Sequence, residues 1–127
     1  MARPRGRRHA SETESLSRAL RAAEAAESKR AEDVVVLDLR GQTLVTDYFV
    51  ICTGGSRVQI RAIVDAVHDA MADLAAAGGM RVAREGDAAA QWVLLDFGDV
   101  VAHVFGPEAR AFYRLERLWG NARVVSR

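Results

Sequence analysis

Hydrophobic positions follow a helical period near the start of the chain. Apolar and small side chains recur there every three or four positions, at Leu16, Ala19, Leu20, Ala23 and Ala26. This spacing predicts a helix over about residues 12–28, and Ser11 and Glu14 have the spacing of a capping box. Because most of the stripe is alanine, which gains little from burial, we expect this helix to be loosely held.

Two short β-branched and aromatic runs come next and predict two strands. Residues 34–37 are apolar throughout, as in a strand buried on both faces, and residues 48–52 form the second run. Ser56 and Gln59 form another capping box. A second helix is predicted after it, from the apolar positions Ile60, Ile63, Val64, Val67, Met71 and Leu74. Gly78 and Gly79 are typical of a helix end.

The second half of the chain predicts three more strands and a last helix. Residues 80–85 suit a short edge strand, and the apolar runs 92–97 and 100–105 are joined by a Gly-Asp pair typical of a type II′ hairpin. Pro107 suits the first position of the last helix, whose apolar face would be Phe112, Leu115, Leu118 and Trp119. We therefore expect an α/β fold, a mixed five-stranded sheet with the helices mainly on one face.

The two-residue turn fixes which hairpin residues share a face. One face is wholly apolar and predicts core; its cross-strand pairs are Phe97 with Val100, Leu95 with Ala102, and Val93 with Val104. The other face mixes aromatic, aliphatic and polar side chains; its pairs are Asp96 with Val101, Leu94 with His103, and Trp92 with Phe105.

This second face allows two interpretations. If the helices cover the apolar face, the second face can be exposed, and it is too hydrophobic for an ordinary solvated surface. It would then bind a protein through Trp92, with Asp96, Asp99 and His103 as the polar complement. The alternative is a second core layer in which His103 pairs with Asp96 across the strands. The pattern alone favours neither.

The net charge of +1 combines a basic arm with an acidic body. Residues 1–10 contain four arginines and no acidic residue, so residues 11–127 carry −3. An acidic body argues against a nucleic-acid-binding surface across the fold and suits a basic protein partner, although the arm alone could touch phosphate. We expect a disordered arm over residues 1–10, one domain over residues 11–120 and a C-terminal tail over residues 121–127.

Cysteine and histidine usage argues against metal or disulfide chemistry. Cys52 is the only cysteine and lies in a buried-looking strand, and the three histidines are scattered, so we expect no metal site and no cofactor. No apolar run is long enough to cross a membrane, and no signal peptide is visible. We therefore expect a cytoplasmic protein without membrane contact.

The alternative function is nucleotidyl transfer. Gly55 and Ser56, between a strand and a helix, match the Gly-Ser element with which that fold holds a phosphate at a helix N-terminus. Transfer also requires clustered carboxylates that hold magnesium, and the following strand has no pair of acidic residues one position apart. Asp38, Asp47 and Asp96 could still converge in space. On the last helix, Tyr113 and Glu116 would either extend a binding face or, as we expect, tie the helix to the sheet.

Several stretches also carry a family likeness: residues 31–41, 46–54, 92–105 and 110–119. Together they resemble the Iojap family of ribosomal silencing factors, in order from about residue 16 to residue 119. The resemblance implies a nucleotidyltransferase-like fold without enzyme activity. It also implies binding to ribosomal protein L-fourteen on the large ribosomal subunit, which sterically blocks joining of the small subunit and lowers translation when nutrients are short.

The resemblance favours the protein-binding interpretation of the hairpin, because the family's contact tryptophan falls on Trp92. We therefore predict partner contacts at Trp92, Leu94, Asp96, Asp99, Val101 and His103, and no catalytic residue. An exposed apolar sheet face could also pair with a second copy of itself, which would give a homodimer of the free protein.

Overall fold

The computed structural model describes residues 12–77 and 82–127. Its helices and strands are, in chain order, α1 (Glu12–Ser28), β1 (Glu32–Asp38), β2 (Tyr48–Thr53), α2 (Arg57–Ala77), β3 (Ala83–Asp87), β4 (Trp92–Asp96), β5 (Val100–Phe105), α3 (Pro107–Tyr113), α4 (Leu115–Leu118) and β6 (Arg123–Val124). Ser11 and the Gly78-Gly79 pair lie outside the described residues, so the predicted cap and helix end there are untested.

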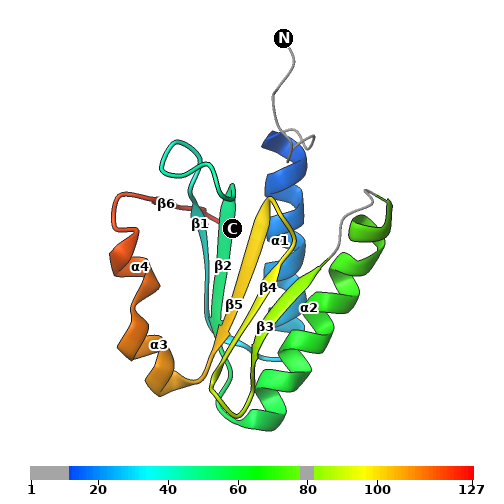
Figure 1. The fold of residues 1–127 in the computed structure, drawn as a ribbon, viewed down its shortest axis with the longest axis vertical. Helices are drawn as coiled ribbons and strands as arrows, with labels where there is room; N and C mark the ends of the chain where they lie inside the picture. Colours follow the sequence, from blue (N-terminus) through cyan, green and yellow to red (C-terminus); the bar gives the residue numbers. More distant parts are fainter. Residues whose placement is uncertain (1–11, 78–81) are drawn as a thin grey trace.

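One mixed sheet organises the fold, in the strand order β3-β4-β5-β2-β1-β6. β2 and β5 are parallel and the other neighbours are antiparallel. The long helices α1 and α2 share one face, while the short helices α3 and α4 run along the other (Figure 1). The predicted α/β fold is confirmed, with helices mainly on one face.

The sheet has six strands instead of five because the end of the chain joins it. β6 pairs with Leu37 and Asp38 of β1, and the Val125 N–H donates to the Val36 carbonyl at 2.8 Å. Arg127 then forms an ion pair with Glu27 of α1. The segment after residue 120, which we expected to be a tail, is therefore part of the folded domain.

The face beneath α1 and α2 holds the main core. Ala19, Ala22, Ala23 and Ala26 of α1 are at most 1% exposed, and the apolar stripe of α2 from Ile60 to Met71 is equally buried. Alanine side chains let α1 lie close to both the sheet and α2, so the expectation of a loosely packed helix is wrong. The predicted cap of α2 is present: Ser56 Oγ accepts the Gln59 N–H at 3.1 Å.

The edge strand begins later than the sequence pattern predicted. Residues 80 and 81 lie outside the described residues, and β3 occupies Ala83–Asp87. Gly86 in this strand has φ +82°, and a Cβ atom there would lie 2.1 Å from the Trp92 carbonyl oxygen. Only glycine permits this backbone so close to β4.

The last helix is broken where the sequence predicted continuity. Pro107 does begin α3, but Arg114 adopts a left-handed conformation (φ 49°) and separates α3 from α4. The break changes the direction of the side chains that follow it. Leu115 and Trp119 pack on the sheet, whereas Phe112 and Leu118 are 78% and 72% exposed. The predicted assignment of Phe112 and Leu118 to the core is therefore wrong.

Candidate protein-binding face

The β4–β5 hairpin has the predicted register. Trp92 lies opposite Phe105, Leu94 opposite His103, and Asp96 opposite Val101. The Phe97 N–H donates to the Val100 carbonyl at 2.9 Å, and Gly98 has φ 92° at the first turn position, as a type II′ turn requires. The apolar face of the hairpin packs beneath the long helices, as expected.

The other face of the hairpin is half covered. Val101, His103 and Phe105 of β5 are 7%, 4% and 1% exposed, and the segment of α3 and α4 packs beside them. The expectation that this whole face is exposed is therefore wrong for β5. In contrast, Trp92, Leu94 and Asp96 of β4 are only half-buried. Each of the two interpretations thus describes one of the two strands.

His103 is a core residue that orients the tryptophan. The Trp92 Nε1–H donates to His103 Nδ1 at 3.2 Å, so His103 is not paired with Asp96. Phe49 packs edge-on against the imidazole at 4.5 Å. Burial lowers the pKa of His103 to about 4, because desolvation disfavours the charged ring. The ring is therefore neutral near pH 7 and acts as a hydrogen-bond acceptor for Trp92.

A groove of about 230 Å³ opens beside Trp92, lined by Glu85, Gly86, Ala90, Trp92, Leu94 and Tyr113. Tyr113 comes from α3 and lies 4.5 Å from Trp92 between ring centroids, Phe105 stacks on Trp92 at 5.1 Å, and the Phe105 and Tyr113 rings are themselves 6.1 Å apart. The indole is thus part of a three-ring cluster that fixes its position and leaves part of its surface open. Such a partly open aromatic side chain can anchor a partner.

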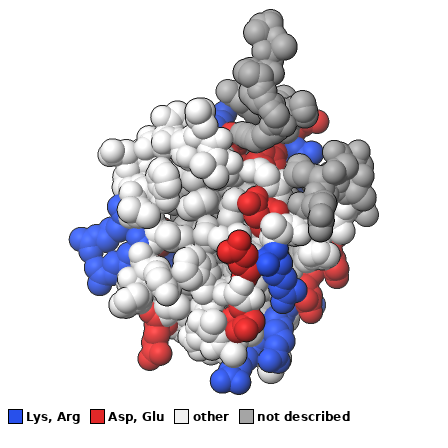
Figure 2. Space-filling view, viewed as in Figure 1, with Lys and Arg blue, Asp and Glu red and all other residues white. Residues whose placement is uncertain are grey.

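Acidic residues of the edge strand border the groove. Glu85 lies opposite Leu94, and Asp87 lies opposite Trp92, so both share the face of the tryptophan. In Figure 2 acidic and basic side chains lie side by side over this part of the molecule, next to an uncharged surface. The sequence pattern placed Glu85 in the edge strand without a role, and it left Asp87 outside because the predicted strand ended at residue 85. Asp87 itself is the signal that could have located the strand end, because aspartate is typical at the start of a turn. Its carboxylate accepts the Ala90 N–H at 2.8 Å in the turn that follows β3. We call Glu85, Asp87, Trp92, Leu94 and Tyr113 the Trp92 face.

Asp99 lies on the opposite side of the sheet from the Trp92 face. It is 4% exposed, and its Oδ2 accepts hydrogen bonds from Ser15 Oγ at 2.9 Å and from Arg18 at 3.0 Å. This carboxylate holds α1 to the hairpin turn and is not accessible to a partner. Val101 and His103 are likewise buried here, so of the six predicted contact residues the structure leaves Trp92, Leu94 and Asp96 accessible.

The carboxylates considered for nucleotidyl transfer have structural partners. Asp38 binds Arg40 and Arg123, and hydrogen bonds chiefly from Arg40 lower its pKa to about 2. Asp47 accepts a hydrogen bond from Ser15, and Asp96 accepts the Gly98 N–H. Across residues 12–77 and 82–127, no three acidic, histidine or cysteine side chains gather as metal ligands would.

Two further residues, Cys52 and Glu116, take the structural roles that the sequence predicted. Cys52 is buried, and desolvation raises the pKa of its thiol to about 12, so it is a small core residue. Glu116 binds Arg110, which also donates to Thr53 Oγ1 at 2.9 Å and so ties α3 and α4 to the sheet. None of the described helices is long and apolar enough to cross a membrane.

Known structures share this architecture. A crystal structure of a protein from Chromobacterium violaceum superposes with a TM-score of 0.75 at 32% identity, covering 83% of this chain and 85% of that one. The fold is therefore that of a known class of small α/β domains.

The family is shown by sequence. Residues 12–127 match the family described as ribosomal silencing factor during starvation, and the chain belongs to this family. Ribosomal silencing factor RsfS of Bacillus subtilis is 48% identical over 102 residues, which cover 80% of this chain and 83% of that protein. The chloroplastic protein Iojap of Zea mays is 41% identical over 114 residues, which cover 90% of this chain and 48% of that protein.

Proposed function

We propose that this protein binds ribosomal protein L-fourteen on the large ribosomal subunit through the Trp92 face. Bound there, it stands in the way of the small subunit, prevents the two subunits from joining and lowers translation when nutrients are short. The observation that carries the proposal is the half-buried Trp92, fixed by His103, Phe105 and Tyr113 beside an open groove. Membership of the silencing-factor family supports it.

The chemistry of the Trp92 face suits a basic protein surface. Glu85 and Asp87 are exposed beside the aromatic groove, and ribosomal proteins are mostly basic. Complementary charges speed the encounter and fix the register of a complex, while buried apolar anchors mainly set how slowly it dissociates. Obstruction requires no reaction and no cofactor, so a rigid body is sufficient, and the place of action in this proposal is the cytoplasm.

Sedimentation with purified subunits tests the proposal. The Trp92→Ala variant should no longer co-sediment with large subunits and should no longer prevent subunit joining. Val58→Ala is the matched control, because Val58 is 73% exposed on α2, away from the Trp92 face. Since Trp92 also packs inside the protein, Glu85→Arg provides a second variant on an exposed position. It should weaken binding most at low salt, where charge steering is strongest.

The outcomes are distinct. Loss of co-sedimentation in Trp92→Ala with an unchanged circular dichroism spectrum, together with normal binding by Val58→Ala, supports the proposal. Full binding by both Trp92→Ala and Glu85→Arg would show that another surface contacts the ribosome.

A further inference from the structure

Charge is distributed unevenly within the acidic body. Residues 11–106 carry a formal charge of −6, whereas residues 107–127 carry +3. The excess of arginine begins with α3, and Figure 2 shows basic side chains projecting at the left edge, where Figure 1 places α3 and α4. The acidic net charge of the body therefore conceals a basic surface.

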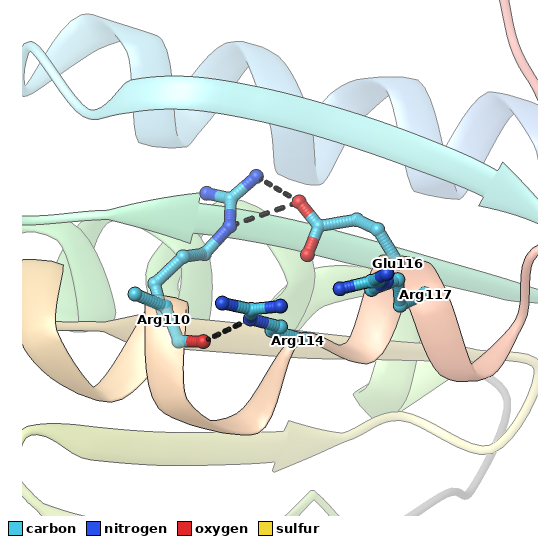
Figure 3. A pocket seen from close by; sticks show the side chains of 5 residues that line it. Arg110, Arg114, Glu116 and Arg117 are labelled. Atoms are coloured by element: carbon cyan, nitrogen blue, oxygen red, sulfur yellow. Dashed lines mark hydrogen bonds and ion pairs between the residues drawn. The ribbon is translucent and has the colours of Figure 1, made fainter.

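These arginines surround an open cavity of about 380 Å³ lined by Arg110, Ala111, Arg114, Glu116 and Arg117 (Figure 3). The Arg110 side chain is 13% exposed and is fixed by Glu116 and Thr53. Glu116 is the one acidic residue in the cavity lining, and it is paired with Arg110. The positive charges of Arg114 and Arg117 are therefore not balanced by an acidic residue of the lining.

The arrangement of Arg114 follows from the helix break. Its left-handed backbone places the residue at the corner between α3 and α4, and its Nε–H donates to the Ala111 carbonyl at 2.9 Å. This bond holds the guanidinium beside the cavity. Arg117 is exposed one turn further along α4. Planar guanidinium groups with several donors match the oxygen atoms of a phosphate.

Exposed aromatic rings accompany these arginines. Phe112 is 78% and Tyr113 46% exposed, and the two rings meet edge-to-face at 5.0 Å. A large apolar ring with this exposure makes little contribution to the core. Alternating arginine and exposed aromatic residues are typical of surfaces that bind unpaired RNA, where phosphates meet the arginines and bases stack on the rings.

We propose that Arg114, Arg117 and Phe112 form an RNA-binding patch. Arg114 and Arg117 bind backbone phosphates, and an unpaired base stacks on Phe112. In the setting of the proposed function the RNA would be an exposed loop of ribosomal RNA next to the protein contact. The inference rests on that function only for the identity of the RNA, because the patch and the Trp92 face share no residue.

Fluorescence anisotropy with a labelled single-stranded oligouridylate tests the patch on the full chain. The Arg114→Asn/Arg117→Gln variant should bind about tenfold more weakly than wild type, and the slope of log affinity against log salt should fall by about 1.4. Asparagine tolerates the left-handed backbone at this corner, so the fold should persist. Arg57→Gln/Arg61→Gln is the matched control, since it removes equal charge from exposed positions of α2.

Two additional variants separate the contributions. Arg114→Lys/Arg117→Lys keeps the charge and should retain most of the affinity, while Phe112→Ser should weaken binding without changing the salt slope. Equal weakening by the α2 control, or no weakening by the Arg114→Asn/Arg117→Gln variant, would overturn the patch. Preference for a polyglutamate peptide over the oligouridylate would also overturn it, in favour of an acidic protein.

Subunit sedimentation distinguishes this inference from the proposed function. If Trp92→Ala abolishes co-sedimentation and the Arg114→Asn/Arg117→Gln variant has wild-type salt dependence there and in anisotropy, only the patch fails. If wild-type protein binds no large subunits but the oligouridylate result is as expected, only the proposed function fails.

Discussion

The two faces of the sheet are built differently. The face under α1 and α2 contains alanine and aliphatic side chains that are almost completely buried. The opposite face carries a histidine and several aromatic rings under two short helices separated at Arg114, and part of it remains open. The α1–α2 face therefore contributes most of the packing that stabilises the fold, while the less completely covered face leaves side chains accessible for binding.

The largest expected loss of stability comes from truncating a buried aliphatic side chain, and one such substitution is chosen on each face of the sheet. Ile63→Ala on α2 should lower the free energy of unfolding by about 3–4 kcal/mol, because the residue is fully buried and a cavity would remain. Leu115→Ala on α4 should cost about 1–2 kcal/mol, because Leu115 is half-buried. Urea unfolding measures both. Equal losses would contradict the assignment of stability to the α1–α2 face.

Asp99 provides a test of moderate size. Asp99→Asn should lower the free energy of unfolding by about 1–2 kcal/mol, because it weakens the charged hydrogen bonds to Ser15 and Arg18 beneath α1. Large-subunit binding by the folded variant should be unchanged, with Asp65→Asn on an exposed position of α2 as the charge-matched control. Weakened binding at unchanged stability would show instead that Asp99 meets the partner.

The buried His103 makes the free energy of unfolding depend on pH. Its folded pKa of about 4 lies below the unfolded value near 6.5. Unfolding therefore takes up a proton between these values, and stability falls as the pH drops through this window, by up to about 1.4 kcal/mol per unit. His103→Gln should remove this part of the slope in urea unfolding from pH 7 to pH 4.5. An unchanged slope would mean that the imidazole titrates normally.

The smallest expected effect concerns the exposed rings of the broken helix. Phe112→Ser should change the free energy of unfolding by less than about 0.5 kcal/mol, because the side chain is mostly in solvent. Thermal unfolding by circular dichroism checks this. A loss above about 2 kcal/mol would return Phe112 to the core, where the helical pattern of the sequence had placed it.

Local patterns predicted what local chemistry controls. The Ser56 cap and the register of the β4–β5 hairpin follow from short-range geometry and are as predicted, although the Gln59 side chain accepts the Gly55 N–H instead of the Ser56 N–H of a full capping box. Non-local packing was not predictable in the same way. The break at Arg114 places an arginine in a backbone conformation that its identity does not indicate, and this break determines which side chains cover β5.

The candidate site was only partly predicted, because its accessibility depends on non-local packing. Trp92 and Leu94 are half-buried because β4 lies beside an exposed edge strand, whereas the α3–α4 segment packs on this face of β5 and buries its side chains. Alternation along the hairpin identifies the face but not which strand is covered. Asp99 was placed on the wrong side because the partner that buries it, α1, is more than 80 residues away.

Hydrogen exchange on the complex with purified ribosomal protein L-fourteen tests the central claim most directly. Backbone amides of β3 and of the turn at residues 88–91 border the Trp92 face at the edge of the sheet. Binding should slow their exchange while leaving exchange in α1 and α2 unchanged. Protection confined to α1 and α2, with β3 unaffected, would contradict the assignment of the Trp92 face as the binding surface.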